Sequence, residues 1–277
     1  MKKFLVALLA AAILCSCDNQ AGFFSALLQS IGNAIVDEGE TTLQTQPALM
    51  ELPTIEDDDI IITHIGYTIS YNAEARIPEW VAYELTADET RGESGRDDAM
   101  FQMDPDYRST QAMREDYSGS GWTKGHMACA GDFHWDSDAL GETFYLTNVC
   151  PQDETLNQGD WNYLERQVRN WARDYGKVWV VTGPIIGTGK YGVIGDRDVV
   201  VPDSFFKAVM YQNKGKFHSI AFVMGNDSAR YYLNDCCMSV NELEELTGLD
   251  FFPMLDDSVE ESVESQLHPS DWGIRQR

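Results

Sequence analysis

Hydrophobic and polar positions repeat along the chain with two different periods, which predict both strands and helices. Short apolar runs that fit strands lie at 65–71, 80–86, 143–149, 178–185, 199–210 and 217–224. A helical period predicts helices at 156–175 and 240–248, each closed by a glycine. Strands on both sides of a helix indicate an α+β fold with a central, mostly antiparallel sheet flanked by helices.

The predicted helix at 156–175 carries two rows of side chains. An apolar row, which should face the core, contains Leu164, Val168, Trp171 and Tyr175. A second row at spacings of four residues contains Asn157, Trp161, Glu165 and Arg169. Because each step of four advances only about 40° around a helix, these four should form one ladder beside the apolar row.

The two ends of the chain lack the pattern of the middle. Residues 1–17 have two lysines, an apolar run too short to span a bilayer, and the sequence LCSC, which resembles a lipobox. We therefore expect an exported bacterial lipoprotein, held at the periplasmic face or the cell surface by a lipid on Cys17. A plain cleaved signal peptide is the alternative.

The expected domain order follows from the same contrast. After the signal peptide (1–17) comes an acidic linker or membrane-proximal segment (18–60), in which 23–36 has the spacing of an amphipathic helix. The folded domain covers 61–255, and 256–277 reads as an acidic C-terminal tail. The chain has 20 basic and 45 acidic residues, a net charge of −25. Such a charge disfavours a nucleic-acid partner unless a local basic site and a metal ion bind the phosphates.

Three short segments stand together in the interpretation: 124–126, 145–152 and 157–169, of which the first and the last contain the side chains that such chemistry needs. Lys124-Gly125-His126, predicted as a turn, supplies an imidazole that can act as a base near neutral pH. Asn157 and Glu165 supply oxygen ligands for a hard cation such as Mg²⁺. Arg169 supplies a guanidinium for a phosphate oxygen.

These segments also carry a family resemblance. The stretch 123-TKGHMACAGD-132 resembles the Asp-Arg-Gly-His signature of the DNA/RNA non-specific endonucleases, the endonuclease G-like, ββα-metal (His-Me finger) group. The likeness continues through 142–152, the helix that begins at Asn157, 181–185, 201–207 and 247–252. It covers about residues 65–255 and implies a ββα-metal nuclease fold.

The resemblance also implies a role for each matching residue. It makes His126 the general base, Asn157 the direct ligand of Mg²⁺ and Glu165 a carboxylate that holds the ion through water. Arg169 and, upstream, Arg96 would contact phosphate. Asn148 would orient the site near the histidine.

The sequence departs from the family signature at two places. Thr123-Lys124 stands where the signature has Asp-Arg, and Cys129 where a proline is usual. Lys124 keeps the positive charge but lacks the planar fork of arginine, so its phosphate contact should be less directional. The missing aspartate matters less if the Thr123 hydroxyl can take over its hydrogen bonding.

The expected function is a Mg²⁺-dependent non-specific endonuclease that hydrolyses the phosphodiester bonds of DNA, and of RNA by the same chemistry, with Mn²⁺ as an alternative ion. Two other hypotheses stay open: a catalytically weakened lipoprotein that binds nucleic acid or a protein partner, and a phosphodiesterase for small substrates.

Four cysteines follow the predicted signal peptide. Export would allow disulfides, and Cys129 and Cys150 flank the two catalytic segments, which makes a bridge between them a hypothesis. A zinc site formed by these two with His126 and His134 is an alternative. Apart from that zinc site, His134 is expected to be structural.

Overall fold

The computed structural model describes residues 49–95 and 99–275, which belong to one compact unit, Thr45–Arg277. The predictions for the signal peptide, Cys17, the helix at 23–36 and Arg96 fall outside the described residues. Within the described ranges, none of the helices has the length and apolar character needed to cross a membrane.

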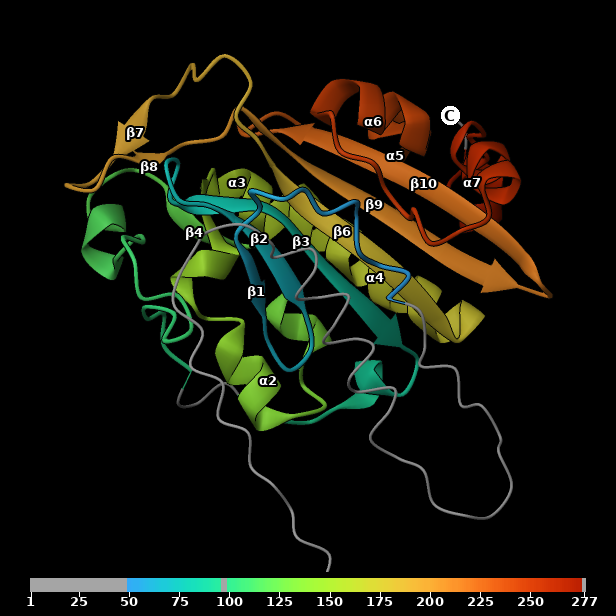
Figure 1. The fold of residues 1–277 in the computed structure, drawn as a ribbon, viewed down its shortest axis with the longest axis horizontal. Helices are drawn as coiled ribbons and strands as arrows, with labels where there is room; N and C mark the ends of the chain where they lie inside the picture. Colours follow the sequence, from blue (N-terminus) through green and yellow to red (C-terminus); the bar gives the residue numbers. More distant parts are fainter. Residues whose placement is uncertain (1–48, 96–98, 276–277) are drawn as a thin grey trace, which may run out of the picture. The chain divides into compact units, whose positions relative to one another are not determined.

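A seven-stranded sheet forms the centre of the unit, in the order β1-β2-β3-β6-β9-β10-β11 (Figure 1). Every neighbouring pair is antiparallel, which confirms the expected sheet. The strands are β1 (Ile61–Thr63), β2 (Thr68–Asn72), β3 (Ile77–Thr86), β6 (Lys177–Ile185), β9 (Ser204–Asn213), β10 (Lys216–Gly225) and β11 (Cys237–Met238).

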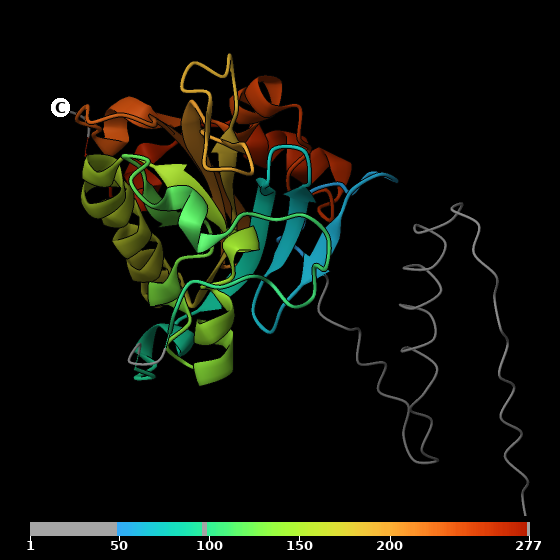
Figure 2. The ribbon, with the colours of Figure 1, turned by 90° about the vertical axis from the view of Figure 1, so that its left-hand side faces the viewer.

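The sheet is buried on both faces, and β6 shows how. Val178 and Val180 belong to the core cluster that also contains Leu164 of helix α4 (Asn162–Tyr175). Trp179 and Val181 belong to a second cluster, together with Val240 of helix α6 (Val240–Thr247). Because side chains alternate along a strand, α4 covers one face, and α6 and α7 (Asp257–Glu264) cover the other (Figures 1 and 2).

A smaller ββα unit lies on the α4 side of the sheet. It consists of β4 (Thr123–His126), β5 (Val149–Gln152) and a helical stretch formed by α3 (Glu154–Leu156), a π-helical turn (Asn157–Trp161) and α4. β4 and β5 pair antiparallel, so the Lys-Gly-His segment is a strand and the predicted turn was wrong. The predicted strand at 143–149 was also wrong: 146–148 form a 3-10 turn, and β5 starts only at Val149.

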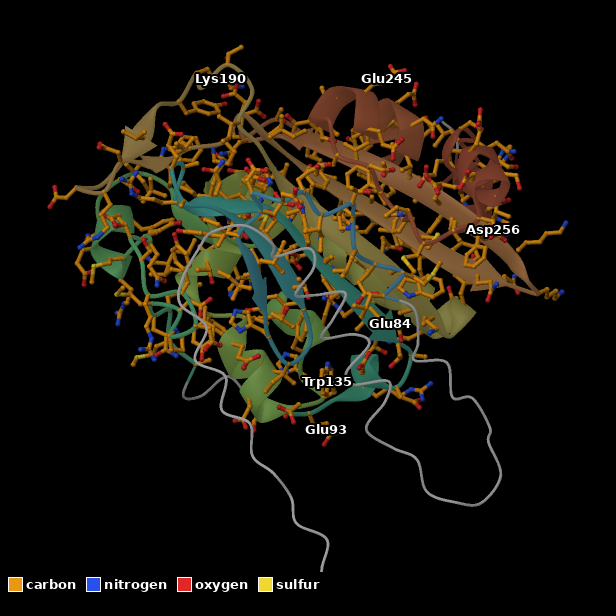
Figure 3. The ribbon with its side chains drawn as sticks, in the orientation of Figure 1. Glu84, Glu93, Trp135, Lys190, Glu245 and Asp256 are labelled. Carbon is orange, nitrogen blue, oxygen red and sulfur yellow. The ribbon has the colours of Figure 1, made fainter. Side chains whose placement is uncertain are left out.

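The other elements are short and connect these two parts. They are η1 (Glu89–Arg91), η2 (Arg114–Tyr117), η3 (Ala130–Asp132), α2 (Ser137–Glu142), η4 (Leu146–Asn148), β7 (Val193–Ile194), β8 (Val199–Val200), α5 (Leu233–Cys236) and η6 (Pro269–Trp272). The expected strand at 199–210 is thus split into β8 and β9. Figure 3 labels two exposed acids on this side of the sheet, Glu245 of α6 and Asp256 directly before α7.

Both segments that flank the predicted domain contain packed residues. Before residue 61, the Thr54 amide donates to the carbonyl of Asp250, and Leu52 packs on the second core cluster. After residue 255, Trp272 is 3% exposed, and its carbonyl accepts a hydrogen bond from the Trp171 indole. The structure therefore differs from a free linker and tail, because apolar side chains among the acids anchor these segments on the sheet.

Candidate active site

His126 is the last residue of β4, where it pairs with Val149 of β5. Its ring lies between two aromatic rings, with centroids 5.0 Å from Phe101 and 4.9 Å from Phe144. Gly125 precedes it because a Cβ there would lie only 2.2 Å from Oε1 of the buried Gln152. The strand pairing and the two rings together fix the position of the imidazole.

Asn148 supports the chain directly after His126. Its side chain is fully buried; Oδ1 accepts from the Ala128 amide at 2.8 Å, and Nδ2 donates to the Ala128 carbonyl at 3.0 Å. A further hydrogen bond from Nδ2 reaches the Thr143 carbonyl at 2.9 Å. Asn148 therefore braces the chain directly after His126, and its orienting role in catalysis stays a prediction.

Asn157 lies where the helix is distorted. Gly159 has the non-helical angles φ −100° and ψ −105°, so the helical stretch is kinked within Asn157–Trp161, between α3 and α4. The distortion breaks the predicted ladder: Trp161 is 1% exposed and sits in the core instead of lining a surface with Asn157.

The Asn157 side chain reaches β4, the strand of His126. Its Nδ2 donates to Thr123 Oγ1 at 3.0 Å and to the Lys124 carbonyl at 3.4 Å. Thr123 Oγ1 in turn donates to the Gln152 carbonyl at 2.8 Å. The Thr123 hydroxyl thus links the Asn157 amide to the backbone of β5.

Glu165 and Lys207 are buried on the same side of the sheet. Glu165 is 9% exposed, and burial raises the pKa of its carboxyl, while the positive charge of Lys207 opposes that rise. Lys207 is fully buried with Nζ 4.9 Å from the centre of the Trp161 ring, and burial lowers its pKa. Lys207 could not be singled out from the sequence, where its only signal is a lysine inside an otherwise apolar strand.

Arg169 makes an ion pair with Asp132, the last residue of the 123–132 motif, which is called the finger below. Its Nη1 donates to Asp132 Oδ1 at 2.5 Å and to Cys129 Sγ at 3.4 Å. Tyr83 donates to the other carboxylate oxygen at 2.8 Å. Burial alone would lower the pKa of Arg169, but Asp132 raises it. This pair joins the finger to α4, and the phosphate role of Arg169 stays a prediction.

Lys124 faces aromatic rings. Its Nζ lies 4.9 Å from the centre of the Tyr117 ring and 5.6 Å from that of Phe101, both cation–π distances. Burial lowers its pKa, and the nearby charge of Arg114 lowers it further. The ammonium group thus lies over Phe101, the ring that also packs on His126.

The four cysteines are free thiols, so the hypothesis of a Cys129–Cys150 bridge was wrong for this structure. Cys129 instead accepts from Arg169, and burial raises the pKa of both Cys129 and Cys150. Within 49–95 and 99–275, the four residues of the alternative zinc site do not form a ligand group. His134 bonds through Nδ1 to the Ser94 carbonyl, a structural role.

The residues around Asn157 fit an oxygen-ligated cation. Because Asn157 Nδ2 donates hydrogen bonds to Thr123 Oγ1 and to the Lys124 carbonyl, Oδ1 is the atom of this amide that can bind a cation. An amide oxygen and a carboxylate, as Asn157 and Glu165 supply, are the donor types that Mg²⁺ or Mn²⁺ takes.

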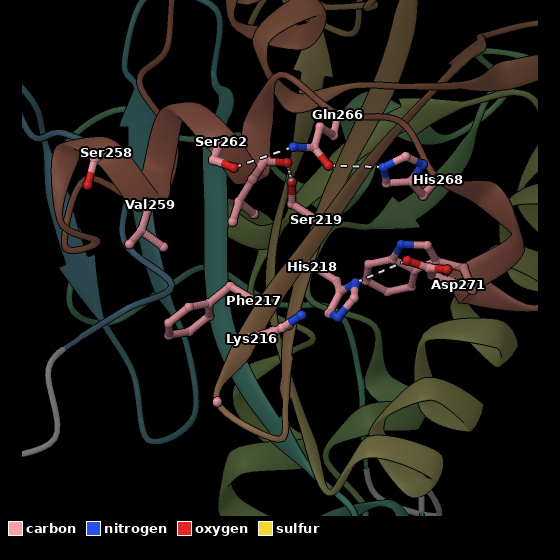
Figure 4. Close-up of a pocket in the computed structure, with 13 residues that line it drawn as sticks. Lys216, Phe217, His218, Ser219, Ser258, Val259, Ser262, Gln266, His268 and Asp271 are labelled. Atoms are coloured by element: carbon pink, nitrogen blue, oxygen red, sulfur yellow. Dashed lines mark hydrogen bonds and ion pairs between the residues drawn. The ribbon is translucent and has the colours of Figure 1, made fainter.

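A second group of ligand-type side chains consists of His64, Asp104 and Asp106, whose ligand atoms lie within 4.8 Å of one another. The sequence analysis missed it because 40 residues separate His64 from Asp104. A separate pocket beside α7 and β10, where His218 Nδ1 lies 3.2 Å from Asp271 Oδ2, contains none of the predicted site residues (Figure 4).

The β4–β5–α4 unit, with a histidine at the end of one strand and an asparagine at the start of the helix, defines the class of ββα-metal nucleases. The chain belongs to the DNA/RNA non-specific endonuclease family, whose model matches residues 48–258.

Individual relatives agree with this assignment. The chain is 37% identical over 208 residues to the mitochondrial nuclease EXOG of Xenopus laevis, covering 70% of this chain and 58% of that protein. It is 33% identical to human mitochondrial endonuclease G, covering 78% and 74%, and 37% identical to nuclease C1 of Cunninghamella echinulata var. echinulata, covering 70% and 83%. The match thus spans less than two thirds of the EXOG proteins.

A solved structure shares the fold. The EndoG chain from a crystal structure of an EndoG/EndoGI complex has a TM-score of 0.70 and 30% identity, covering 76% of this chain and 91% of that chain. This likeness confirms the α+β, endonuclease G-like fold that the sequence predicted.

Proposed function

We propose that this protein is a metal-dependent endonuclease that hydrolyses phosphodiester bonds of DNA and RNA with little base specificity. The observation that carries the proposal is the hydrogen bonding of Asn157 to β4, which ties the metal-ligand candidate to the strand that ends at His126. Membership of a nuclease family supports the substrate class.

In the proposed mechanism His126 removes a proton from a water molecule, and that oxygen attacks the phosphorus. The bond from phosphorus to the 3′ oxygen breaks, which gives a 5′-phosphate, and the leaving 3′ oxygen takes a proton from a solvent water to become the 3′-hydroxyl. Asn157 and Glu165 would hold Mg²⁺, which supplies positive charge against the phosphate. Phe101 and Phe144 keep the imidazole in place, and Asn148 holds the chain behind it.

Lys124 and the arginines would supply the local positive charge that the acidic chain otherwise lacks. Arg169 forms an ion pair with Asp132. We therefore assign it first the role of holding the finger on α4, and second that of contacting a phosphate oxygen. Arg96 is the proposed upstream phosphate contact.

The proposal is tested by cleavage of plasmid DNA and of an RNA of similar length with added Mg²⁺. We expect EDTA to abolish cleavage, and His126→Ala to lower the rate by about 10²–10⁴, the usual contribution of a general base. His268→Ala, which removes an exposed histidine, should leave the rate unchanged. Full activity of folded His126→Ala, or activity in EDTA, would refute this mechanism.

We further propose that the protein is an exported lipoprotein held at a membrane face by a lipid on Cys17. The support is the lipobox-like LCSC sequence after an apolar run. In a bacterial host, Cys17→Ser should move the protein from the membrane fraction to the soluble fraction, with Cys15→Ser as the control. Equal membrane association of both variants would exclude the lipid anchor.

A further inference from the structure

His64, Asp104, Asp106 and Glu142 converge at a place the proposed nuclease chemistry does not use. His64 follows β1, the two aspartates lie in the loop before η2, and Glu142 ends α2. The His64 side chain is fully buried, whereas that of Asp106 is 65% exposed. An ion from solvent can therefore reach the group past Asp106.

The hydrogen bonds of Asp104 fix the orientation of the His64 ring. Asp104 accepts from Thr147 Oγ1 and from the Asp106 amide, and its Oδ2 lies 3.0 Å from His64 Nε2. Because Asp104 already accepts from Thr147 and from the Asp106 amide, it acts as an acceptor, which assigns the proton to His64 Nε2. In that neutral tautomer Nδ1 carries the lone pair.

That lone pair points at two more acceptors. Nδ1 lies 3.8 Å from Asp106 Oδ2 and 4.0 Å from Glu142 Oε2, too far for hydrogen bonds. Within the described ranges of the chain, this buried nitrogen has no hydrogen-bond partner. Glu142 Oε2 also accepts from the Ile65 amide, but a carboxylate oxygen has lone pairs left for a second partner. A buried nitrogen without a partner that faces two carboxylate oxygens leaves room for a cation between them.

The separations suit a metal ion. Bonds of about 2.0–2.2 Å to nitrogen and carboxylate oxygen place two ligands of a tetrahedral ion roughly 3.4 Å apart. Small side-chain movements of Asp106 and Glu142 would close the difference. A carboxylate behind a ligating histidine, as Asp104 stands here, is the usual second partner of such a ring.

We propose that His64 Nδ1, Asp106 and Glu142 bind a divalent first-row transition metal ion, with Asp104 holding the ring. One imidazole with two carboxylates suits Zn²⁺ or Mn²⁺ better than Mg²⁺ or Ca²⁺, which prefer oxygen alone. The ion would link the end of β1, the loop before η2 and α2. That loop also contains Phe101, which packs on His126.

The test uses EDTA-stripped, dialysed protein with Asn157→Ala, which removes the proposed nuclease metal ligand. Titration with Zn²⁺ by calorimetry and metal analysis should show one bound ion and a raised Tm. Asp106→Asn, at an exposed side chain, should weaken binding by tenfold or more. Asp138→Asn, at another exposed acid nearby on α2, should bind as before.

Two results would overturn the proposal. One is Zn²⁺ affinity that is equal in Asp106→Asn and Asp138→Asn. The other is no Zn²⁺ binding together with NMR signals showing both His64 nitrogens protonated at neutral pH, which would place a proton where we place the metal. Because nuclease activity is not the readout, failure of this site leaves the proposed function untouched.

Discussion

The two faces of the central sheet bury charge in different ways. Under α4, buried charges come as opposite signs: Asp132 pairs with Arg169, and Glu165 lies in the field of Lys207. Under α7, Glu264 is 2% exposed, and the groups that shift its pKa besides burial are all acids. The nuclease face thus places acids beside bases next to the proposed site, whereas on the other face a buried carboxyl group has only acids as charged neighbours, which favours its neutral form.

The largest effect on stability should come from breaking the buried pair on the nuclease face. Arg169→Met leaves the fully buried Asp132 with Tyr83 as a neutral donor only. We expect a loss of about 3–5 kcal/mol in the free energy of unfolding, measured by denaturant titration. Arg166→Met, at an exposed site on the same helix, should cost less than about 1 kcal/mol. Equal losses would mean that the ion pair contributes nothing special.

A smaller effect, and one on activity, should come from the contact between the helix and β4. Thr123→Val removes the hydroxyl that accepts from Asn157. Since partners behind metal ligands contribute about 10–100-fold, we expect cleavage to fall by that factor, with a higher Mg²⁺ requirement. Thr155→Val, at an exposed threonine of α3, is the control. If the Mg²⁺ dependence of Thr123→Val were unchanged, Thr123 would have no role in positioning the metal ligand.

The sequence was sufficient for the features that rest on periodicity. The helix that ends at Tyr175 and the strands around β6 and β10 follow from apolar runs, and Leu164 and Val168 are buried as predicted. The segment from Thr143 misled the analysis because its apolar residues are buried in turns, a case in which burial and strand pattern look alike.

The site was predictable in part. The finger at 123–132 and the segment that begins at Asn157 could be found from their sequence motifs. In the structure, Asn157 forms hydrogen bonds to β4, the strand that ends at His126. The kink at Gly159 could not be predicted, because a spacing of four is also the pattern of an uninterrupted helix. Contacts between distant segments, such as Lys207 over Trp161 or His64 beside Asp104, have no periodic signal at all.

The smallest expected effect concerns Glu264, on the face of the sheet that α7 covers. Burial, and then the charges of Glu244, Glu260 and Asp250, raise the pKa of Glu264 from 4.5 to about 9. The folded state therefore binds a proton that the unfolded state releases, so this residue's contribution to stability falls as pH rises from about 4.5 to 9.

Glu264→Gln removes this titration while keeping the shape of the side chain. We expect the variant to match the wild type near pH 4.5 and to be more stable by about 1–2 kcal/mol at pH 8, since even one unit of pKa shift corresponds to about 1.4 kcal/mol. Glu261→Gln, exposed on the same helix, should show no such pH-dependent gain. If Glu264→Gln were less stable at pH 8, Glu264 would be ionised and paired, and the contrast between the two faces would not hold.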